Sequence, residues 1–224
     1  MVEVDTPVVD EDTEQVLTSL LATAAAALES AHLHSTAREL ADMDGLTQLP
    51  NRRRFELDID TEWERCRRYG RPLSMLMLDL DHFKRLNDEH GHLLGDQVLR
   101  EVAQAVSSVL RTTDTAYRYG GEEIAVLLRE TGLEDAAGAA ERIRAAVAGV
   151  SIAGHPDVSV STSAGVAARH TRMSHYTALV EQADRALYDA KRAGRNRVAV
   201  SGEALPDVET LFHGEPDGST VGPS

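Results

Sequence analysis

The chain has 224 residues, enough for one domain of ordinary size with short extensions and too few for a catalytic domain joined to a separate folded sensor. Hydrophobic residues make up 42%, charged residues 27% and aromatic residues only 4%, a composition that excludes a disordered chain and predicts an aliphatic core. The formal net charge of −14 argues against broad attraction to nucleic acid or anionic lipid.

Nothing near the start of the chain is typical of export or of a membrane anchor. Residues 1–14 carry six acids and no base, which is the reverse of a secretory signal. The longest apolar run there, residues 17–28, is about half of the roughly 20 residues that cross a bilayer. We therefore expect a cytoplasmic protein without a membrane span. The single cysteine, Cys66, cannot form an intramolecular disulfide and is expected to be a packing residue.

The two ends of the chain are expected to be acidic disordered tails, over residues 1–12 and 202–224, because they lack apolar periodicity. Between residues 13 and 41, apolar side chains recur every three or four positions without Gly or Pro, which predicts one long helix. We assign segment 13–42 to dimerisation or signalling. Its heptad pattern is weak, so pairing with a second copy and packing against its own domain both remain open.

Helical and strand patterns then alternate along the chain, which predicts a mixed α/β domain containing an antiparallel hairpin. Helices are expected at 51–69, 82–90, 94–109, 133–150 and 177–193, and strands at 73–80, 115–119, 124–128, 158–163 and 197–201. Strand 73–80 is apolar throughout, which indicates burial on both faces. Asp81 is the expected N-cap of the helix that follows, Gly91 its stop, and Gly165 a break after the fourth strand.

Three acids have positions that suggest chemistry. Asp79 ends the most hydrophobic strand, where a buried carboxylate needs a cation or donors, and Glu122 and Glu123 follow two glycines in the hairpin. If these groups converge, their oxygens suit Mg²⁺ or Mn²⁺, and two such ions can assist an in-line phosphoryl displacement. On spacing alone the alternative is equally good: a helix cap and two solvated turn residues.

The sequence resembles the GGDEF-domain diguanylate cyclases, which condense two GTP molecules into cyclic di-GMP. The resemblance runs from about Asp44 to Ser201, with motifs in order and correctly spaced. The matching segments are DGLTQLPNRR at 44–53, DLDHFKRLND at 79–88 with Gly91-His92 and Gly95-Asp96 after it, RYGGEEI at 118–124, SAGVA at 163–167 and ADRALYDAKRAGRN at 183–196.

The resemblance implies an α/β (α+β) fold for a domain at 43–201. This is a palm-like domain with a five-stranded central sheet, an antiparallel hairpin and flanking helices, related to the catalytic domains of adenylyl cyclases and the palms of polymerases. It also implies a homodimer, because each domain presents only one GTP of the reacting pair.

The resemblance implies two Mg²⁺ ions per active site, with Mn²⁺ possible. Asp79, the Leu80 carbonyl and Glu122 would bind metal, and Glu123 would be a further ligand or help to deprotonate the ribose 3′-hydroxyl. The residues implied for GTP are Asn87 and Asp96 at the guanine, Phe83 and Lys84 at the β- and γ-phosphates, Gly120 and Gly121 at the hairpin, and Lys191 and Arg195 at the triphosphate. Without the family, Lys191 and Arg195 would be read as cations favoured by a helix C-terminus.

The chain departs from the usual signature at two positions. Glu122 replaces aspartate, and a carboxylate one methylene longer can still reach an ion. Ile124 replaces phenylalanine at the start of a buried strand, where we expect repacking of roughly 1 to 3 kcal/mol and no lost chemistry.

Residues 111–114, RTTD, match the family's RxxD inhibitory site, which implies that cyclic di-GMP binds there. Arg111 would meet phosphate and the guanine edge, Asp114 the guanine donors, and Arg142 would add a second arginine across an interface. The main alternative is a catalytically weak or inactive receptor of GTP or cyclic di-GMP. A cyclase making another cyclic dinucleotide is disfavoured by Asn87 and Asp96, and a phosphodiesterase by the absence of a matching motif.

Overall fold

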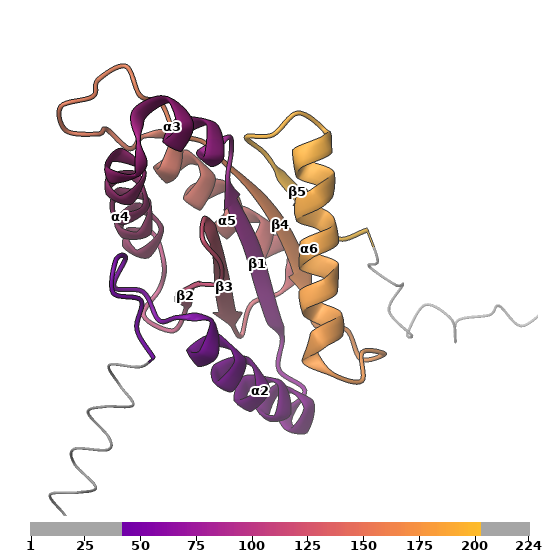
Figure 1. Cartoon of the computed structure of the whole chain (residues 1–224). Helices are drawn as coiled ribbons and strands as arrows, with labels where there is room; N and C mark the ends of the chain where they lie inside the picture. Colours follow the sequence, from indigo (N-terminus) through magenta and orange to yellow (C-terminus); the bar gives the residue numbers. More distant parts are fainter. Residues whose placement is uncertain (1–41, 203–224) are drawn as a thin grey trace, which may run out of the picture.

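The computed structural model describes residues 42–202 (Figure 1). The expected tail at 1–12, all but the first residue of the expected tail at 202–224, and all but the last residue of the expected helix at 13–42 lie outside the described residues. Within them, no helix is long and apolar enough to cross a membrane.

Helices and strands are interspersed along the described chain. The helices are α2 (Arg52–Tyr69), α3 (Phe83–His90), α4 (His92–Ser108), α5 (Leu133–Ala148) and α6 (Tyr176–Arg192). The strands are β1 (Leu73–Leu80), β2 (Thr115–Arg118), β3 (Glu123–Arg129), β4 (Thr162–Ala168) and β5 (Val198–Val200). All five strands form one sheet in the order β2-β3-β1-β4-β5. The predicted five-stranded α/β fold with flanking helices is therefore confirmed.

Strand β1 is the centre of the sheet. It pairs antiparallel with β3 on one side and with β4 on the other, and all eight of its residues are buried, as predicted. Strands β2 and β3 form the expected antiparallel hairpin, and only β4 and β5 are parallel. The register places Asp79 of β1 opposite Glu123 of β3 and opposite Ser163 of β4.

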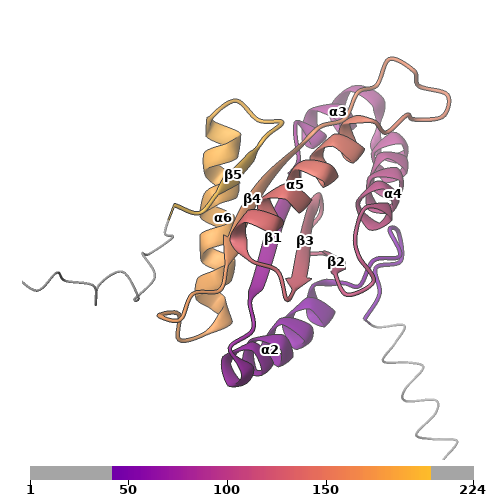
Figure 2. The ribbon, with the colours of Figure 1, turned by 180° about the vertical axis from the view of Figure 1, so that it is seen from behind.

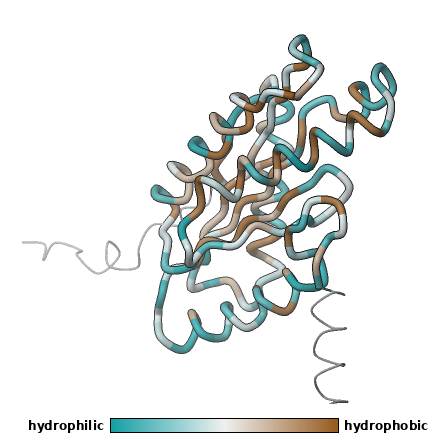
Figure 3. Tube along the Cα trace, turned by 90° about the vertical axis from the view of Figure 1, so that its left-hand side faces the viewer, coloured by the Kyte–Doolittle hydropathy of each residue, from teal (hydrophilic) through white to brown (hydrophobic). Residues whose placement is uncertain are grey.

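Helices cover both faces of the sheet, and alternate residues of each strand face opposite layers. Leu76 and Leu78 of β1 pack with the buried faces of α4 and α5, whereas Met75 and Met77 pack with those of α2 and α6. Helix α6 lies in front of the sheet in Figure 1, and α5 lies in front in Figure 2. Apolar residues follow the central strands between these layers (Figure 3).

Helix α2 is bounded by residues suited to its ends. The Asn51 side chain accepts a hydrogen bond from the Arg54 N–H, and Gly70 ends the helix in the left-handed region at φ 66°. Cys66 is buried on its inner face, as expected of a packing residue, and burial raises the pKa of its thiol.

Four expectations from the sequence are corrected. Strand β4 spans Thr162–Ala168 and not 158–163, so Gly165 lies inside the strand and does not break it. Asp81 is not the N-cap of α3: His82 has that position, at φ 60°, and the Asp81 carboxylate binds other groups. Helix α4 spans His92–Ser108 and not 94–109, and Glu123 is the first residue of β3 and not a turn residue.

Candidate active site

The end of β1 holds a buried carboxylate that is paired with a cation. Asp79 continues the face of Met75 and Met77, which α6 covers, and it is only 7% exposed. Lys191, in the last turn of α6, places its Nζ 2.7 Å from Asp79 Oδ2. The ammonium compensates the cost of burying the carboxylate. Lys191 therefore points into the site, and capping of its own helix does not account for its position.

The hairpin tip is folded tightly against the start of β3. The N–H groups of Tyr119 and Gly120 both donate to the Glu123 carbonyl, at 2.9 and 3.2 Å. A Cβ on Gly120 would lie 2.3 Å from Glu123 Oε2, so the Glu123 carboxylate packs against this glycine and would have to move if the residue were larger. Gly121 is different, because no heavy atom outside its chain neighbours lies within 4 Å of where its Cβ would be. The tip thus offers an open backbone surface next to two carboxylates.

Glu122 follows these glycines, and its main chain is tied to the end of β1. The Leu80 N–H donates to the Glu122 carbonyl at 3.4 Å. Burial raises the pKa of the Glu122 carboxyl, the charge of Asp79 raises it further, and Lys191 opposes the shift. The carboxylates of Asp79 and Glu122 are therefore close enough to repel each other, which favours a cation between them.

Arg118 fastens the hairpin to the entry segment of the domain, a contact that sequence reasoning missed. Its Nη1 lies 2.8 and 3.0 Å from the two carboxylate oxygens of Asp44, and its Nη2 donates to the Gly121 carbonyl at 2.9 Å. Burial alone would raise the pKa of Asp44, but hydrogen bonds from Thr47 and Arg118 outweigh it and lower that pKa. Because the two residues belong to motifs 74 positions apart, no local pattern reveals the pair.

Helices α3 and α4 meet at a polar cradle. A Cβ on Gly95 would lie 1.9 Å from Asn87 Oδ1 and 3.2 Å from the ring of Phe83, so the Asn87 amide lies directly over this glycine. Asn87 Oδ1 is buried and has no hydrogen-bond partner among the described residues. Asp96 follows Gly95 and is half-buried. The cradle thus presents an unsatisfied acceptor beside a carboxylate.

The remaining cations predicted for the triphosphate are more open. Lys84 is exposed in the first turn of α3, after the buried Phe83. Arg195 is exposed in the turn after α6, in the left-handed region at φ 59°. Neither forms an ion pair with another described residue, so both are available to an anionic ligand.

The two carboxylates at the end of β1 fit a hard divalent cation, although they do not fill its coordination shell. Asp79 and Glu122 provide oxygen ligands, the type that Mg²⁺ and Mn²⁺ prefer. In residues 42–202, however, no three His, Cys, Asp or Glu side chains are grouped so as to hold a metal ion. Such a set suits an ion that shares its coordination with substrate phosphates.

The residues predicted for product binding lie away from these carboxylates. Arg111 and Asp114 line one surface pocket of about 400 Å³. Arg111 also lines a neighbouring pocket of about 420 Å³ with three further arginines, Arg65, Arg71 and Arg129. Arg142, on α5, lines neither pocket.

Comparison with known proteins identifies the family of the chain. The family model described as "Diguanylate cyclase, GGDEF domain" matches residues 41–197. The probable diguanylate cyclase DgcC of Escherichia coli K12 is 38% identical over 162 residues, which are 72% of this chain and 44% of DgcC. The chain spans less than half the length of the first curated relatives that it matches.

Solved structures are similar over the same part. The coiled coil and GGDEF domain of DgcB from Caulobacter crescentus, in complex with cyclic di-GMP, is 34% identical with a TM-score of 0.74, covering 82% of this chain and 98% of that one. The active GGEEF domain of a diguanylate cyclase from Vibrio cholerae is 36% identical with a TM-score of 0.66, covering 69% of this chain and 98% of that one. The chain therefore belongs to the family of GGDEF-domain diguanylate cyclases.

Proposed function

We propose that the chain condenses two GTP molecules into cyclic di-GMP and releases two pyrophosphates. The observation that carries this proposal is the convergence of Asp79, Glu122 and Lys191 at the end of β1, where two carboxylates and an ammonium lie beside an open glycine tip. A receptor of GTP or cyclic di-GMP needs no such charge arrangement. The V. cholerae relative, described as active, carries the GGEEF form of the signature, so glutamate at position 122 is compatible with activity.

In the proposed site, Asp79, Glu122 and the Leu80 carbonyl would hold Mg²⁺ or Mn²⁺, two ions per site. When bound, these ions stabilise the charge on the attacking and leaving oxygens of phosphoryl transfer. Glu123 would be a further ligand or would accept the proton of the ribose 3′-hydroxyl. The N-terminus of α3 at Phe83 and Lys84 would meet the outer phosphates.

The rest of the triphosphate would meet Gly120, Gly121 and Arg195, together with Lys191. The cradle between α3 and α4 would select guanine. Asn87 Oδ1 lacks a donor, and guanine offers both an amine and a ring N–H. Asp96 would accept from the same edge of the base, whereas the matching ring nitrogen of adenine carries no proton to donate. This argument disfavours adenine and hence other cyclic dinucleotides.

Catalysis would require a homodimer, because one site binds one GTP and the 3′-oxygen must attack the α-phosphorus of another. We assign segment 13–42 to bringing two domains together or to transmitting a signal, after a tail at 1–12 and before the domain at 43–201 and a tail at 202–224. The reaction would run in the cytoplasm, where GTP is available.

We expect purified protein, stripped of bound nucleotide, to convert GTP but not ATP into the cyclic dinucleotide when Mg²⁺ is present. Replacing Glu122 with Gln, which keeps the size and removes the charge, should lower the rate by roughly 10²-fold or more. The measurement is separation of the nucleotides with counting of pyrophosphate. Persistence of GTP together with tight binding of cyclic di-GMP would instead establish the receptor alternative.

We propose further that cyclic di-GMP inhibits the protein at Arg111 and Asp114. These residues share a pocket, and Arg111 also lines the adjoining one. The other arginines there, Arg65, Arg71 and Arg129, pair with Glu62 or Glu130. Arg111 forms no ion pair within residues 42–202, so its guanidinium group is available to phosphate. Arg142 lines neither pocket, so in this proposal it would act on product held by a neighbouring copy.

Replacing Arg111 with Ala is expected to raise the half-inhibitory concentration of cyclic di-GMP by about tenfold or more, the effect of losing a hydrogen bond to a charged group. The initial rate without product should stay unchanged. Arg100→Ala, which removes an exposed arginine of α4, is the matched control and should leave inhibition intact. Unchanged product inhibition in Arg111→Ala would refute this role.

A further inference from the structure

The turn after α6 has a backbone conformation that needs support. Arg195 and Asn196 are consecutive and both left-handed, at φ 59° and 45°. For an arginine this conformation costs roughly 1 kcal/mol or more, whereas asparagine adopts it more readily, so the strain lies at Arg195 and needs support from the surroundings. Arg195 lies in this turn, four residues after Lys191. Both residues are cations of the proposed triphosphate site.

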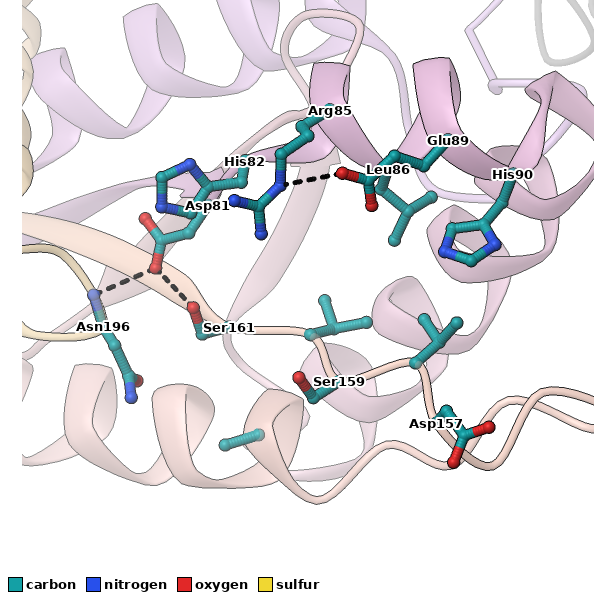
Figure 4. Close-up of a pocket in the computed structure, with 13 residues that line it drawn as sticks. Asp81, His82, Arg85, Leu86, Glu89, His90, Asp157, Ser159, Ser161 and Asn196 are labelled. Carbon is teal, nitrogen blue, oxygen red and sulfur yellow. Dashed lines mark hydrogen bonds and ion pairs between the residues drawn. The ribbon is translucent and has the colours of Figure 1, made fainter.

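The support comes from Asp81, two residues beyond Asp79. One oxygen of the Asp81 carboxylate accepts from the Asn196 N–H at 2.9 Å and from the Ser161 hydroxyl at 2.7 Å, as Figure 4 shows. The other oxygen accepts from the Ser163 hydroxyl at 2.7 Å. We call these three contacts the Asp81 clasp. The clasp joins the end of β1 to the start of β4 and to the turn after α6.

A second contact holds Asn196, through its side chain. Arg144 of α5 donates from Nη1 to the Asn196 side-chain oxygen at 2.8 Å, and its own Nε is paired with Glu141 at 2.7 Å. Asn196 is therefore bound through its backbone by Asp81, just after β1, and through its side chain by Arg144 of α5. Both contacts orient the turn and leave the preceding side chain, Arg195, exposed.

The clasp lies at the edge of an open cleft of about 480 Å³ between α3 and residues 157–161 (Figure 4). Water in this cleft can reach the Ser161 hydroxyl and the Asn196 N–H, which line it, whereas Ser163 is fully buried. Loss of the Asp81 carboxylate would therefore leave two donors that water can satisfy and one buried hydroxyl without its acceptor. The Tm of each variant is measured with its KM, so that a change in the position of the turn is separated from a loss of stability.

We propose that Asp81 is a positioning residue for the triphosphate site, acting through Asn196 to hold Arg195 where it meets substrate phosphate. This inference rests on the proposed function, because it takes GTP as the ligand. Asp81 itself faces the serines and the turn, and it has no assigned part in the chemistry. Asp79, two residues earlier, faces α6 and pairs with Lys191. The two acids of this short segment therefore have different roles, metal binding for Asp79 and positioning of the turn for Asp81.

The test is a double-mutant cycle with Asp81→Ala and Arg195→Ala in the full chain. Each single change should raise the KM for GTP by about tenfold, the size of one lost hydrogen bond to a charged group, with kcat within a few-fold of wild type. The double variant should be no worse than Arg195→Ala, because each change removes the same contact. Asp81→Asn keeps an oxygen that can accept from the Asn196 N–H and should restore most of the affinity.

Amide hydrogen exchange gives a readout that does not depend on turnover. Exchange at residues 194–197 should speed up in Asp81→Ala and stay as in wild type in the control Asp157→Ala, which changes an exposed carboxylate at the same cleft. The positioning role would be overturned if the KM of the double variant rose by the product of the two single increases, since the two residues would then act independently. Unchanged amide exchange at the turn in Asp81→Ala would overturn it as well. If wild type makes no cyclic di-GMP, the proposed function fails, and the cycle is then read from the Kd of GTP.

Discussion

Replacing Asp79 with asparagine is expected to lower kcat for cyclic di-GMP formation by about 10³-fold or more. The substitution keeps the shape of the side chain and removes a charge that pairs with Lys191 at 2.7 Å and interacts with Glu122. A bound divalent ion would lose one of its anionic ligands, and several kcal/mol of transition-state stabilisation correspond to this factor. The measurement is the steady-state rate of pyrophosphate release at saturating GTP and Mg²⁺.

The fold should survive this change, because Lys191 remains partly exposed and can turn to water. The control is Asp60→Asn, which removes one carboxylate from the exposed face of α2 and should leave both the rate and the Tm unchanged. Loss of activity together with a normal Tm in Asp79→Asn would locate the defect in the site. A variant that keeps a tenth of the wild-type rate would contradict a metal-binding role for Asp79.

The sequence was sufficient to find this carboxylate because its signal is local. An uninterrupted apolar run predicts a central strand, and an acid at the end of that run is unusual enough to mark a site. Period-two alternation then places Asp79 on the face of Met75 and Met77. Only the tertiary structure shows that α6 covers this face and that Lys191 pairs with the carboxylate.

Contacts between distant motifs could not be predicted from local patterns. Asp81 precedes a helix, which is where an N-cap is expected, yet its carboxylate binds partners 80 to 115 residues away. Arg118 and Asp44 likewise pair across 74 residues. For Asp81 the N-cap rule failed because donors from other parts of the chain bind its carboxylate, and for Arg118 and Asp44 no local rule connects the two motifs.

Strand β4 shows a second kind of failure, in which a local rule is overridden by packing. Gly165 lies within β4 and pairs with Met77 of β1, although glycine weakens a strand. A Cβ there would lie 2.1 Å from the Ala183 carbonyl oxygen and 2.2 Å from the Leu187 nitrogen of α6. The glycine is needed so that the helix backbone can approach the strand, and this reason is invisible without α6.

Replacing Gly165 with Ala is therefore expected to lower the free energy of unfolding by about 3 kcal/mol or more, the upper range for overpacked cores. The clashing atoms are main-chain atoms of α6, so no side chain can rotate away, and relief requires a shift of the whole helix. That shift would also move Lys191 away from Asp79. Urea unfolding measures the stability, and the KM for GTP of the remaining folded protein reports the displacement.

Gly138→Ala is the matched control, because it adds the same methyl group to a helix of the same domain. Outside the backbone of its own helix, the nearest heavy atom to its Cβ would be Arg142 Nη1, at 3.8 Å. Alanine favours a helix interior by up to about 1 kcal/mol over glycine. The two substitutions should thus change stability in opposite directions. A loss below about 1 kcal/mol in Gly165→Ala would mean that α6 can retreat from β4 at little cost. The link between this helix contact and the geometry of the Lys191–Asp79 pair would then have to be abandoned.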